Sequence, residues 1–231
     1  MASSKNVPQH IGFIVDGNRR WAKKHGLPSY EGHLAGFNAL KEVAQAVWDA
    51  GVKNLSFYVF STENWKRSEQ EVSYLMKLIK RLVKEETPSL IEREVRLKVI
   101  GSPEGLSQPV KDAIAKAEQA TGHLTKGTLL LCINYGGQAE IVDAVKLIIK
   151  SEVSAEEVTT GLIEQNLYSP GTPPVDIIVR TSGEQRLSNF MLWRAAYSEL
   201  LFLDKQWPEM TKDDVASILD EYSKRSRRFG G

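Results

Sequence analysis

The chain has 231 residues, 42% of them hydrophobic, and a formal net charge of +1. This length fits one large α/β domain or two small ones, and the near-neutral charge is not that of a protein that coats nucleic acid. The single cysteine, Cys132, excludes an intramolecular disulfide and agrees with a reducing, cytoplasmic setting. No run of apolar residues approaches the roughly 20 needed to span a bilayer, so any membrane contact is expected to be peripheral.

Short apolar segments of strand length alternate with segments of helical spacing along the chain. The expected strands cover residues 11–15, 54–60, 96–100, 128–134, 175–180 and 200–203. The expected helices cover residues 34–50, 69–85, 109–121, 138–150 and 212–225. This alternation predicts an α/β fold whose mostly parallel sheet is covered on both faces. We find no linker or repeat, so residues 1–231 are expected to form a single domain, with a flexible segment at 1–9.

Polar residues follow the first expected strand, where Asp16 and Gly17 precede Asn18 and two arginines that open an expected helix. In open α/β sheets, ligands bind at the carboxyl ends of the strands. A glycine before a helix N-terminus offers N–H donors to a phosphate, and an aspartate can hold a divalent metal beside it. The same residues equally fit an Asp-Gly turn that caps an ordinary helix, and this segment alone leaves both interpretations open.

The second expected strand also ends in polar residues, because a hydroxyl, a carboxylate and an amide follow it at Ser61, Glu63 and Asn64. The next helical segment has a broad apolar face over residues 72–83 and a proline at Pro88. It fits a core helix that breaks at the proline, and it also fits one wall of a long apolar groove. The sequence does not separate these two interpretations.

The fifth expected strand leads into a loop with Arg180, Arg186 and Ser188. Guanidinium groups bind phosphate oxygens bidentately, and hydroxyls fill the remaining acceptor directions, so this placement favours anion binding over a solvated charged loop. Glu199 opens the last strand, where a partly buried carboxylate needs a metal or an arginine as its partner. No Walker A motif, dinucleotide-binding glycine motif, nucleophile elbow or zinc spacing accompanies these residues.

Several motifs occur in the order found in one known family: Asp16-Gly17-Asn18-Arg19-Arg20-Trp21, Gly32-His33, Phe60-Ser61-Thr62-Glu63-Asn64-Trp65, Asn134-Tyr135-Gly136-Gly137, Arg180-Thr181-Ser182-Gly183-Glu184-Gln185-Arg186-Leu187-Ser188 and Glu199. Together they resemble the cis-prenyltransferases, which include undecaprenyl diphosphate synthase and dehydrodolichyl diphosphate synthase. The resemblance runs from about His10 to Arg228-Phe229-Gly230. The aspartate-rich metal motifs of trans-prenyltransferases are absent from the sequence.

This resemblance implies a six-stranded, mostly parallel sheet surrounded by helices, with a hydrophobic tunnel, in a homodimer. It implies an enzyme that condenses isopentenyl diphosphate with an allylic diphosphate, such as farnesyl diphosphate. The products would be a Z-polyprenyl diphosphate and pyrophosphate, and the cofactor would be Mg²⁺. The Arg-x-Gly ending at 228–230 would reach the partner subunit's site, and the basic residues before it could also contact an anionic membrane surface.

The resemblance also assigns roles to residues. Gly17, Asn18 and Arg20 would hold the allylic diphosphate, whereas Arg180, Arg186 and Ser188 would bind isopentenyl diphosphate. Asp16 would position the metal with help from Glu199, and Asn64 would act with Ser61 in orienting the reacting groups and assisting proton removal. The further expected substrate-binding residues are Trp21, His33, Glu63, Trp65 and Arg67.

The sequence departs from the family pattern at three positions. Ser29 stands where many bacterial members have an arginine that contacts the allylic diphosphate, and Phe37 and Val59 occupy tunnel positions where some long-chain enzymes have alanine. Bulk there could shorten the product, because an overfilled pocket rejects further length. A short-chain or irregular-coupling enzyme of the same superfamily therefore stays open as a second interpretation. A non-catalytic partner subunit is a third, although such subunits lack the first aspartate that this chain has.

Overall fold

The structure is a computed structural model that describes residues 7–225. Residues 1–6 and 226–231 lie outside the described residues. With them lie most of the segment predicted to be flexible and the predicted Arg-x-Gly ending.

Within residues 7–225, six strands form one sheet in the order β3-β4-β2-β1-β5-β6, and all five pairs of neighbours are parallel. The strands are β1 His10–Ile14, β2 Asn54–Ser61, β3 Val95–Ile100, β4 Gly127–Tyr135, β5 Ile177–Arg180 and β6 Glu199–Phe202. The predicted six-stranded parallel sheet is confirmed. The chain leaves β1 toward β2 on one side and later returns to β5 on the other, so the carboxyl end of β1 lies where the strand order reverses. Open α/β sheets bind ligands at this point.

The predicted helices, including the one expected to open at Asn18, are confirmed with shifted ends, and the short helix α6 is added to them. The helices are α1 Asn18–Lys24, α2 Ser29–Asp49, α3 Glu69–Glu92, α4 Gln108–Thr121, α5 Gly137–Lys150, α6 Thr160–Asn166 and α7 Lys212–Lys224. Single 3-10 turns lie at η1 Thr62–Lys66, η2 Ala155–Glu157 and η3 Trp207–Glu209. None of the described helices is both long enough and apolar enough to cross a membrane.

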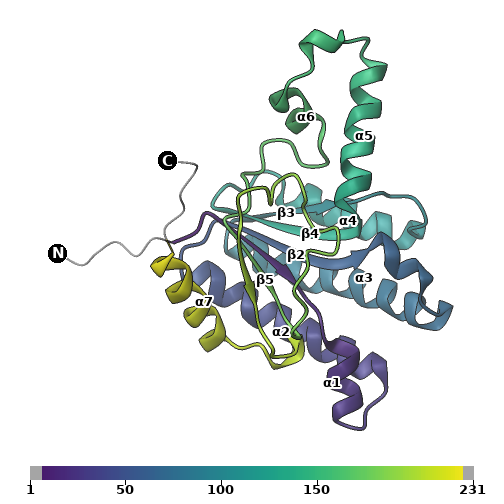
Figure 1. Cartoon of the computed structure of the whole chain (residues 1–231). Helices are drawn as coiled ribbons and strands as arrows, with labels where there is room; N and C mark the ends of the chain where they lie inside the picture. The colour runs from purple at the N-terminus through teal and green to yellow at the C-terminus, as the bar shows by residue number, and fades with distance from the viewer. Residues whose placement is uncertain (1–6, 226–231) are drawn as a thin grey trace.

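The main hydrophobic core lies between the sheet and helices α2, α3, α4 and α7 (Figure 1). Its aromatic centre is formed by Phe13, Phe57 and Trp207, whose ring centroids lie 5.5–5.8 Å apart. A smaller core on the opposite face is packed by the loop between β5 and β6, which stacks Phe190 on Tyr58 with centroids 4.9 Å apart. Both faces are therefore covered, one by helices and the other largely by a loop that begins at the carboxyl edge.

Helix α3 continues through Pro88 to Glu92, so the predicted break at the proline is wrong. A proline inside a helix costs about 3 kcal/mol, because it removes a hydrogen bond and crowds the preceding turn. Here the turns on both sides are anchored in one core, since Leu82 and Leu90 are both buried. Tertiary packing therefore outweighs the local signal.

Candidate active site

The turn after β1 places Asp16 and Gly17 at the carboxyl edge of the sheet. Gly17 has a φ of 108°, and a Cβ at this position would come within 3.0 Å of both Gln206 Cβ and Ser182 Oγ. Only glycine adopts this turn without strain. Helix α1, which follows, has seven residues. So short a helix supplies little dipole, and the attraction for phosphate predicted at its N-terminus has to come mainly from side chains.

Asp16 joins two arginines from distant parts of the sequence. Its Oδ1 lies 3.0 Å from Arg20 Nη2, and its Oδ2 accepts a hydrogen bond from Arg180 Nη2 at 2.9 Å. The Thr181 hydroxyl donates to the Asp16 carbonyl at 2.6 Å. Burial raises the pKa of Asp16, but hydrogen bonds and charges from Arg180 and Arg20 outweigh it and hold the pKa below its usual value. Asp16 is therefore an ionised carboxylate, fixed between two cations.

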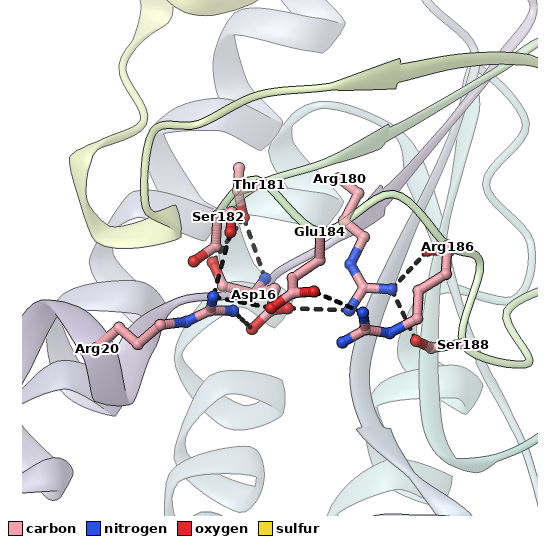
Figure 2. Close-up of polar contacts among 8 residues, drawn as sticks. All are labelled: Asp16, Arg20, Arg180, Thr181, Ser182, Glu184, Arg186 and Ser188. Carbon is pink, nitrogen blue, oxygen red and sulfur yellow. Dashed lines mark hydrogen bonds and ion pairs between the residues drawn. The ribbon is translucent and has the colours of Figure 1, made fainter.

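The loop after β5 gathers the remaining charges of the site (Figure 2). Glu184 accepts a hydrogen bond from Arg20 Nη1 at 3.0 Å and pairs with Arg186 Nη1 at 2.5 Å. Arg180 Nη1 donates to Ser188 Oγ at 2.7 Å and also to the Arg186 carbonyl. Three arginines and two carboxylates thus form one connected network with an excess of positive charge. Such an excess, presented as guanidinium groups, is complementary to a phosphate or diphosphate.

The same loop is strained at several positions that are not glycine. Ser182, Ser188, Asn189 and Met191 have φ values of 76°, 47°, 67° and 44°. Left-handed backbone at such residues costs of order 1–3 kcal/mol each and persists only where surrounding contacts hold it. Strain of this kind concentrates at binding sites, and here it coincides with the arginine network.

Buried polar atoms without a partner also gather here. Among the described residues, the buried side-chain atoms that lack a hydrogen-bond partner are Asn18 Oδ1, Trp48 Nε1, Arg180 Nε and Gln206 Oε1. Asn18, Arg180 and Gln206 all belong to segments that meet at the β1 turn. Leaving such an atom unpaired costs about 1–3 kcal/mol. The segments at this turn therefore have an unpaired donor and two unpaired acceptors that a polar ligand could bind.

A cavity of about 1130 Å³ joins these charges to an apolar interior. Its polar lining includes Asp16, Arg20 and Arg180. Much of its apolar lining comes from α2, α3, β2 and η3 and includes Phe37, Leu40, Val59, Leu75, Leu78, Ile79, Leu82 and Trp207. The interpretation of α3 as a groove wall is therefore confirmed, and a site that is charged and apolar at once suits an amphiphilic ligand.

His33 and Arg67 meet at Glu71 in the wall between α2 and α3. Glu71 Oε1 lies 3.0 Å from His33 Nε2 and accepts a hydrogen bond from Arg67 Nη1 at 3.0 Å. Burial lowers the pKa of His33, and Glu71 only partly offsets this effect, so the imidazole is neutral at pH 7. Glu71 was not among the residues predicted for the site. One sequence feature could have indicated it. Glu71 lies four residues after Arg67, at the start of helix α3, and opposite charges at this spacing often pair.

Ser61 and Asn64 stand at the carboxyl end of β2 and both line the cavity. Asn64 Oδ1 accepts a hydrogen bond from the Ser61 N–H at 3.1 Å, which fixes the turn at η1. The neighbouring Glu63 also lines the cavity, and hydrogen bonds from its surroundings hold its pKa below the usual value against the effect of burial.

Most of the predicted site residues share this cavity. Its lining includes Asp16, Gly17, Asn18, Arg20, His33, Ser61, Glu63, Asn64, Arg67, Arg180 and Ser188. Arg186 is not among the lining residues, but it joins the network through Glu184. Arg19, Lys23 and Asn189 line the cavity as well, although no functional role was predicted for them.

Trp21 and Trp65 do not line the cavity and have other contacts. Trp21 packs on His25, with ring centroids 4.3 Å apart. Trp65 donates from Nε1 to Asn134 Oδ1 at 2.7 Å and packs edge-on against Phe60. These contacts support the loops around the site, and direct substrate binding by either tryptophan stays a prediction.

Glu199 lies at the other edge of the sheet from Asp16. It is the first residue of β6 and pairs with Ile177, the first residue of β5, whereas Asp16 follows the carboxyl end of β1. Its carboxylate pairs with Arg225 Nη1 at 3.0 Å. Of the two partners expected for Glu199, a metal or an arginine, the structure shows an arginine. Within one chain, Glu199 does not lie where it could share a metal with Asp16.

No group of three or more histidine, cysteine, aspartate or glutamate side chains that could hold a metal occurs within residues 7–225. Of the two predicted metal ligands, Asp16 and Glu199, only Asp16 lies at the carboxyl edge of the sheet.

Comparisons with known proteins agree with this geometry. A family model described as putative undecaprenyl diphosphate synthase matches residues 14–230. An isoprenyl transferase from Thermotoga maritima is 45% identical over 227 residues, covering 97% of both chains. The (2E,6E)-farnesyl-diphosphate-specific ditrans,polycis-undecaprenyl-diphosphate synthase of Micrococcus luteus is 40% identical, covering 99% of this chain and 94% of that protein.

Two solved structures are also similar. Lavandulyl diphosphate synthase from Lavandula x intermedia, in complex with dimethylallyl diphosphate, has a TM-score of 0.94 and 30% identity, covering 97% of this chain and 99% of that one. A probable undecaprenyl diphosphate synthase from Campylobacter jejuni has a TM-score of 0.82 and 30% identity, covering 98% of this chain and all of that one.

Proposed function

The chain belongs to the undecaprenyl diphosphate synthase family of prenyltransferases, and from this premise we propose that it condenses isopentenyl diphosphate with an allylic diphosphate such as farnesyl diphosphate. The products are a Z-polyprenyl diphosphate and pyrophosphate. One observation carries the proposal: the Asp16, Arg20 and Arg180 network lines the same cavity as the apolar side chains of α2 and α3. Both substrates have a diphosphate head and a hydrocarbon tail, and the site has a matching surface for each part.

In the proposed reaction, the allylic C–O bond breaks, the isopentenyl double bond attacks the allylic carbon, and a proton leaves the isopentenyl unit. Negative charge grows on the departing allylic diphosphate, and the guanidinium group of Arg20, fixed by its pair with Asp16, stabilises it without reorganising. The apolar walls exclude water, which would otherwise trap the cation-like carbon. Ser61 and Asn64, which both line the cavity, orient the reacting groups and assist the loss of the proton.

The two diphosphates are assigned to the two halves of the charged network. Gly17, Asn18 and Arg20 hold the allylic diphosphate at the β1 turn. Arg180, Arg186 and Ser188 hold isopentenyl diphosphate on the loop after β5. The isopentenyl half of this division is supported by the unpaired Arg180 Nε donor, and the allylic half by the partly exposed guanidinium of Arg20 beside the β1 turn.

The residues present fit Mg²⁺ held jointly with substrate. Mg²⁺ keeps several waters and is bound through one or two carboxylates plus phosphate oxygens, so a single carboxylate such as Asp16 is sufficient on the protein side. Asp16 is ionised and lines the cavity. The neighbouring Arg20 and Arg180 carry more positive charge than Asp16 neutralises, which favours the binding of a further anion. When bound, Mg²⁺ supplies positive charge to the departing diphosphate. Glu199 could bind a metal at this site only from another chain.

We also propose a homodimer, formed through α5. This helix projects from the body of the protein together with α6 (Figure 1). Val142, Val145 and Ile149 share one of its faces and are 51%, 41% and 69% exposed. Apolar side chains in one exposed stripe favour a protein partner. Light scattering of Ile149→Asp should give a monomer where the unaltered chain gives a dimer, and an unchanged mass would remove α5 from the interface.

A peripheral membrane contact is expected for product release, because a long polyprenyl chain is poorly soluble in water. Flotation of the protein with liposomes that contain the polyprenyl product tests this expectation.

The second candidate is transfer between short substrates, as in an irregular-coupling enzyme. It is favoured by the close structural match to lavandulyl diphosphate synthase and by the bulk of Phe37 and Val59 in the cavity lining. The deciding experiment incubates the purified chain and Mg²⁺ with labelled isopentenyl diphosphate and primers of graded length, and sizes the products. Elongation of farnesyl diphosphate to a long chain supports the main proposal, and products that end after one addition, or that join two allylic diphosphates alone, support the second. No turnover with any primer, with or without isopentenyl diphosphate, would refute both.

A further inference from the structure

Asn189 connects the arginine network to helix α5. Its backbone carbonyl accepts a hydrogen bond from the Gly137 N–H at 2.7 Å, and its Oδ1 accepts one from the Gln138 N–H at 2.8 Å. Its Nδ2 lies 3.4 Å from Glu63 Oε1. Asn189 therefore bonds the first turn of α5 with both its main chain and its side chain, while it faces the residues that follow β2.

Helix α5 has no side-chain cap of its own, because its N-cap is Gly136. The first N–H groups of any helix need acceptors, and Asn189, which is 51 residues beyond Gln138 in the chain, provides two of them. The contact depends on a close approach. A Cβ on Gly136 would lie 2.7 Å from Asn189 Nδ2, so the glycine leaves the space that the amide occupies.

The conformation of Asn189 is tied to the site through its neighbour. Asn189 has a φ of 67°, and Ser188 before it has a φ of 47°. Asparagine tolerates left-handed backbone better than most residues, but serine at such a φ needs outside contacts to hold it. Ser188 Oγ accepts the hydrogen bond from Arg180 Nη1 at 2.7 Å, and Arg180 in turn binds Asp16. The cap on α5 thus fixes the backbone that presents Ser188 to Arg180.

We propose that Asn189 is a positioning residue for the diphosphate bound by Arg180, Arg186 and Ser188, acting by anchoring their loop to the N-terminus of α5. The inference rests on the proposed function, which assigns isopentenyl diphosphate to that half of the network. Losing the anchor frees the strained backbone at Ser188, Asn189 and Met191 to relax. Relaxation moves the Ser188 hydroxyl away from Arg180, whereas the β1 turn that holds the allylic diphosphate has no bond to Asn189 among those described.

Three substitutions separate the roles of the residue. Asn189→Ala removes the side-chain amide and disfavours the left-handed backbone, Asn189→Gly removes the amide but tolerates that backbone, and Asn189→Asp keeps an acceptor but sets a negative charge near Glu63. We expect KM for isopentenyl diphosphate to rise about tenfold in the alanine variant, less in the glycine variant and least in the aspartate variant. KM for the allylic substrate should stay within twofold in all three. Asn54→Ala, which deletes an amide hydrogen bond at the amino edge of the sheet, is the control.

The variants are compared by steady-state kinetics with each substrate varied in turn, by thermal melting, and by calorimetric titration with inorganic pyrophosphate. A rise in KM confined to isopentenyl diphosphate, with recovery in the aspartate variant, supports the inference. Equal changes in both KM values, or melting that falls while both KM values hold, would overturn it, because a merely structural residue behaves in that way. If the unaltered chain shows no condensation, the proposed function fails, and weaker pyrophosphate binding by the alanine variant still tests the anchor by itself.

Discussion

Two charged clusters of this protein use the same residue types but differ in how completely their bonds are satisfied. At the carboxyl edge, the Asp16 side chain is 28% exposed and pairs with two arginines, while Arg180 Nε beside it has no partner. On helix α5, which follows β4, Glu140 is fully buried. It pairs with Arg194 at 2.8 Å and accepts further bonds from the Tyr135 hydroxyl and the Tyr168 N–H.

The difference shows what each cluster does. The Glu140 cluster is closed, since its acceptors are occupied by protein donors, and a closed buried cluster holds elements together. The Asp16 cluster has excess positive charge, strained backbone and unpaired atoms, and it opens onto a cavity. These features cost stability in the empty protein and favour a ligand that completes them. We therefore expect substitutions at Asp16 to change activity and substitutions at Glu140 to change stability.

Asp16→Ala should lower turnover by about 10³-fold, because it removes the carboxylate that fixes two arginines and would hold Mg²⁺. The fold should survive, since Arg180 keeps its bonds to Ser188 Oγ and the Arg186 carbonyl. Steady-state assays and thermal melting of the same preparation measure both effects. A variant that keeps more than a tenth of the original rate would refute the metal role of Asp16.

Glu140→Ala should show the reverse pattern, a free energy of unfolding lower by about 3–5 kcal/mol, because it leaves the buried Arg194 without its counter-ion. Urea denaturation measures the loss. Lys146→Ala, which breaks the exposed pair with Asp143 on the same helix, is the control and should cost less than 1 kcal/mol. Equal losses in the two variants would mean that the buried pair has no special structural role.

The carboxyl-edge site was readable from the sequence, because in a parallel sheet every strand ends at the same edge. Asp16, Ser61 and Arg180 each close or follow an apolar strand, and their convergence needed no knowledge of the packing. The same rule predicts that Glu199 lies at the amino edge, because it is the first residue of its strand. The family resemblance hid that conclusion by assigning Glu199 to the metal.

Other features were beyond the sequence because they depend on contacts between distant segments. Glu140 sits in an ordinary amphipathic helix, and nothing local reveals that Arg194 reaches it from 54 residues away. The anchoring role of Asn189 depends likewise on the meeting of the loop with α5. Pro88 misled the prediction in the opposite sense, since a strong local signal was overcome by the buried leucines on both sides.

A third prediction concerns the pH dependence of stability and involves His10, a buried and hydrogen-bonded histidine far from the site. Burial lowers the pKa of His10 from 6.5 to about 4, and the ring lies between Ser56 Oγ and the Pro173 carbonyl. The unfolded chain therefore takes up this proton first as the pH falls. The stability that neutral His10 contributes is complete above pH 6.5 and is lost as the pH falls toward 4, by about 3 kcal/mol.

The measurement compares urea unfolding of the unaltered chain and His10→Asn at pH 7, 5.5 and 4.5. The asparagine variant lacks the titrating ring, so the stability gap between the two proteins should narrow as the pH falls. A gap that stays constant over this range would show that His10 takes up its proton equally well in the folded and unfolded chains.

The smallest expected change in rate comes from the apolar part of the cavity. Phe37 lines the cavity, and its ring is covered by Lys41 Nζ at 5.4 Å and Arg81 Cζ at 5.5 Å from the centroid. These cation contacts hold the ring in place. Phe37→Ala should lengthen the longest product by one or two isoprene units and leave the rate of the first addition within about threefold, because burying each further CH₂ group gains roughly 0.8 kcal/mol once space exists.

Thin-layer sizing of labelled products measures that shift. Tyr30→Ala on the same helix is the control, because Tyr30 is 48% exposed and is not part of the cavity lining. Longer products from the Phe37 variant alone would place the length limit in the apolar wall, separate from the charged cluster that sets the rate. Unchanged products would mean that neighbouring side chains refill the space, and the limit would then have to be sought at Val59 or along α3.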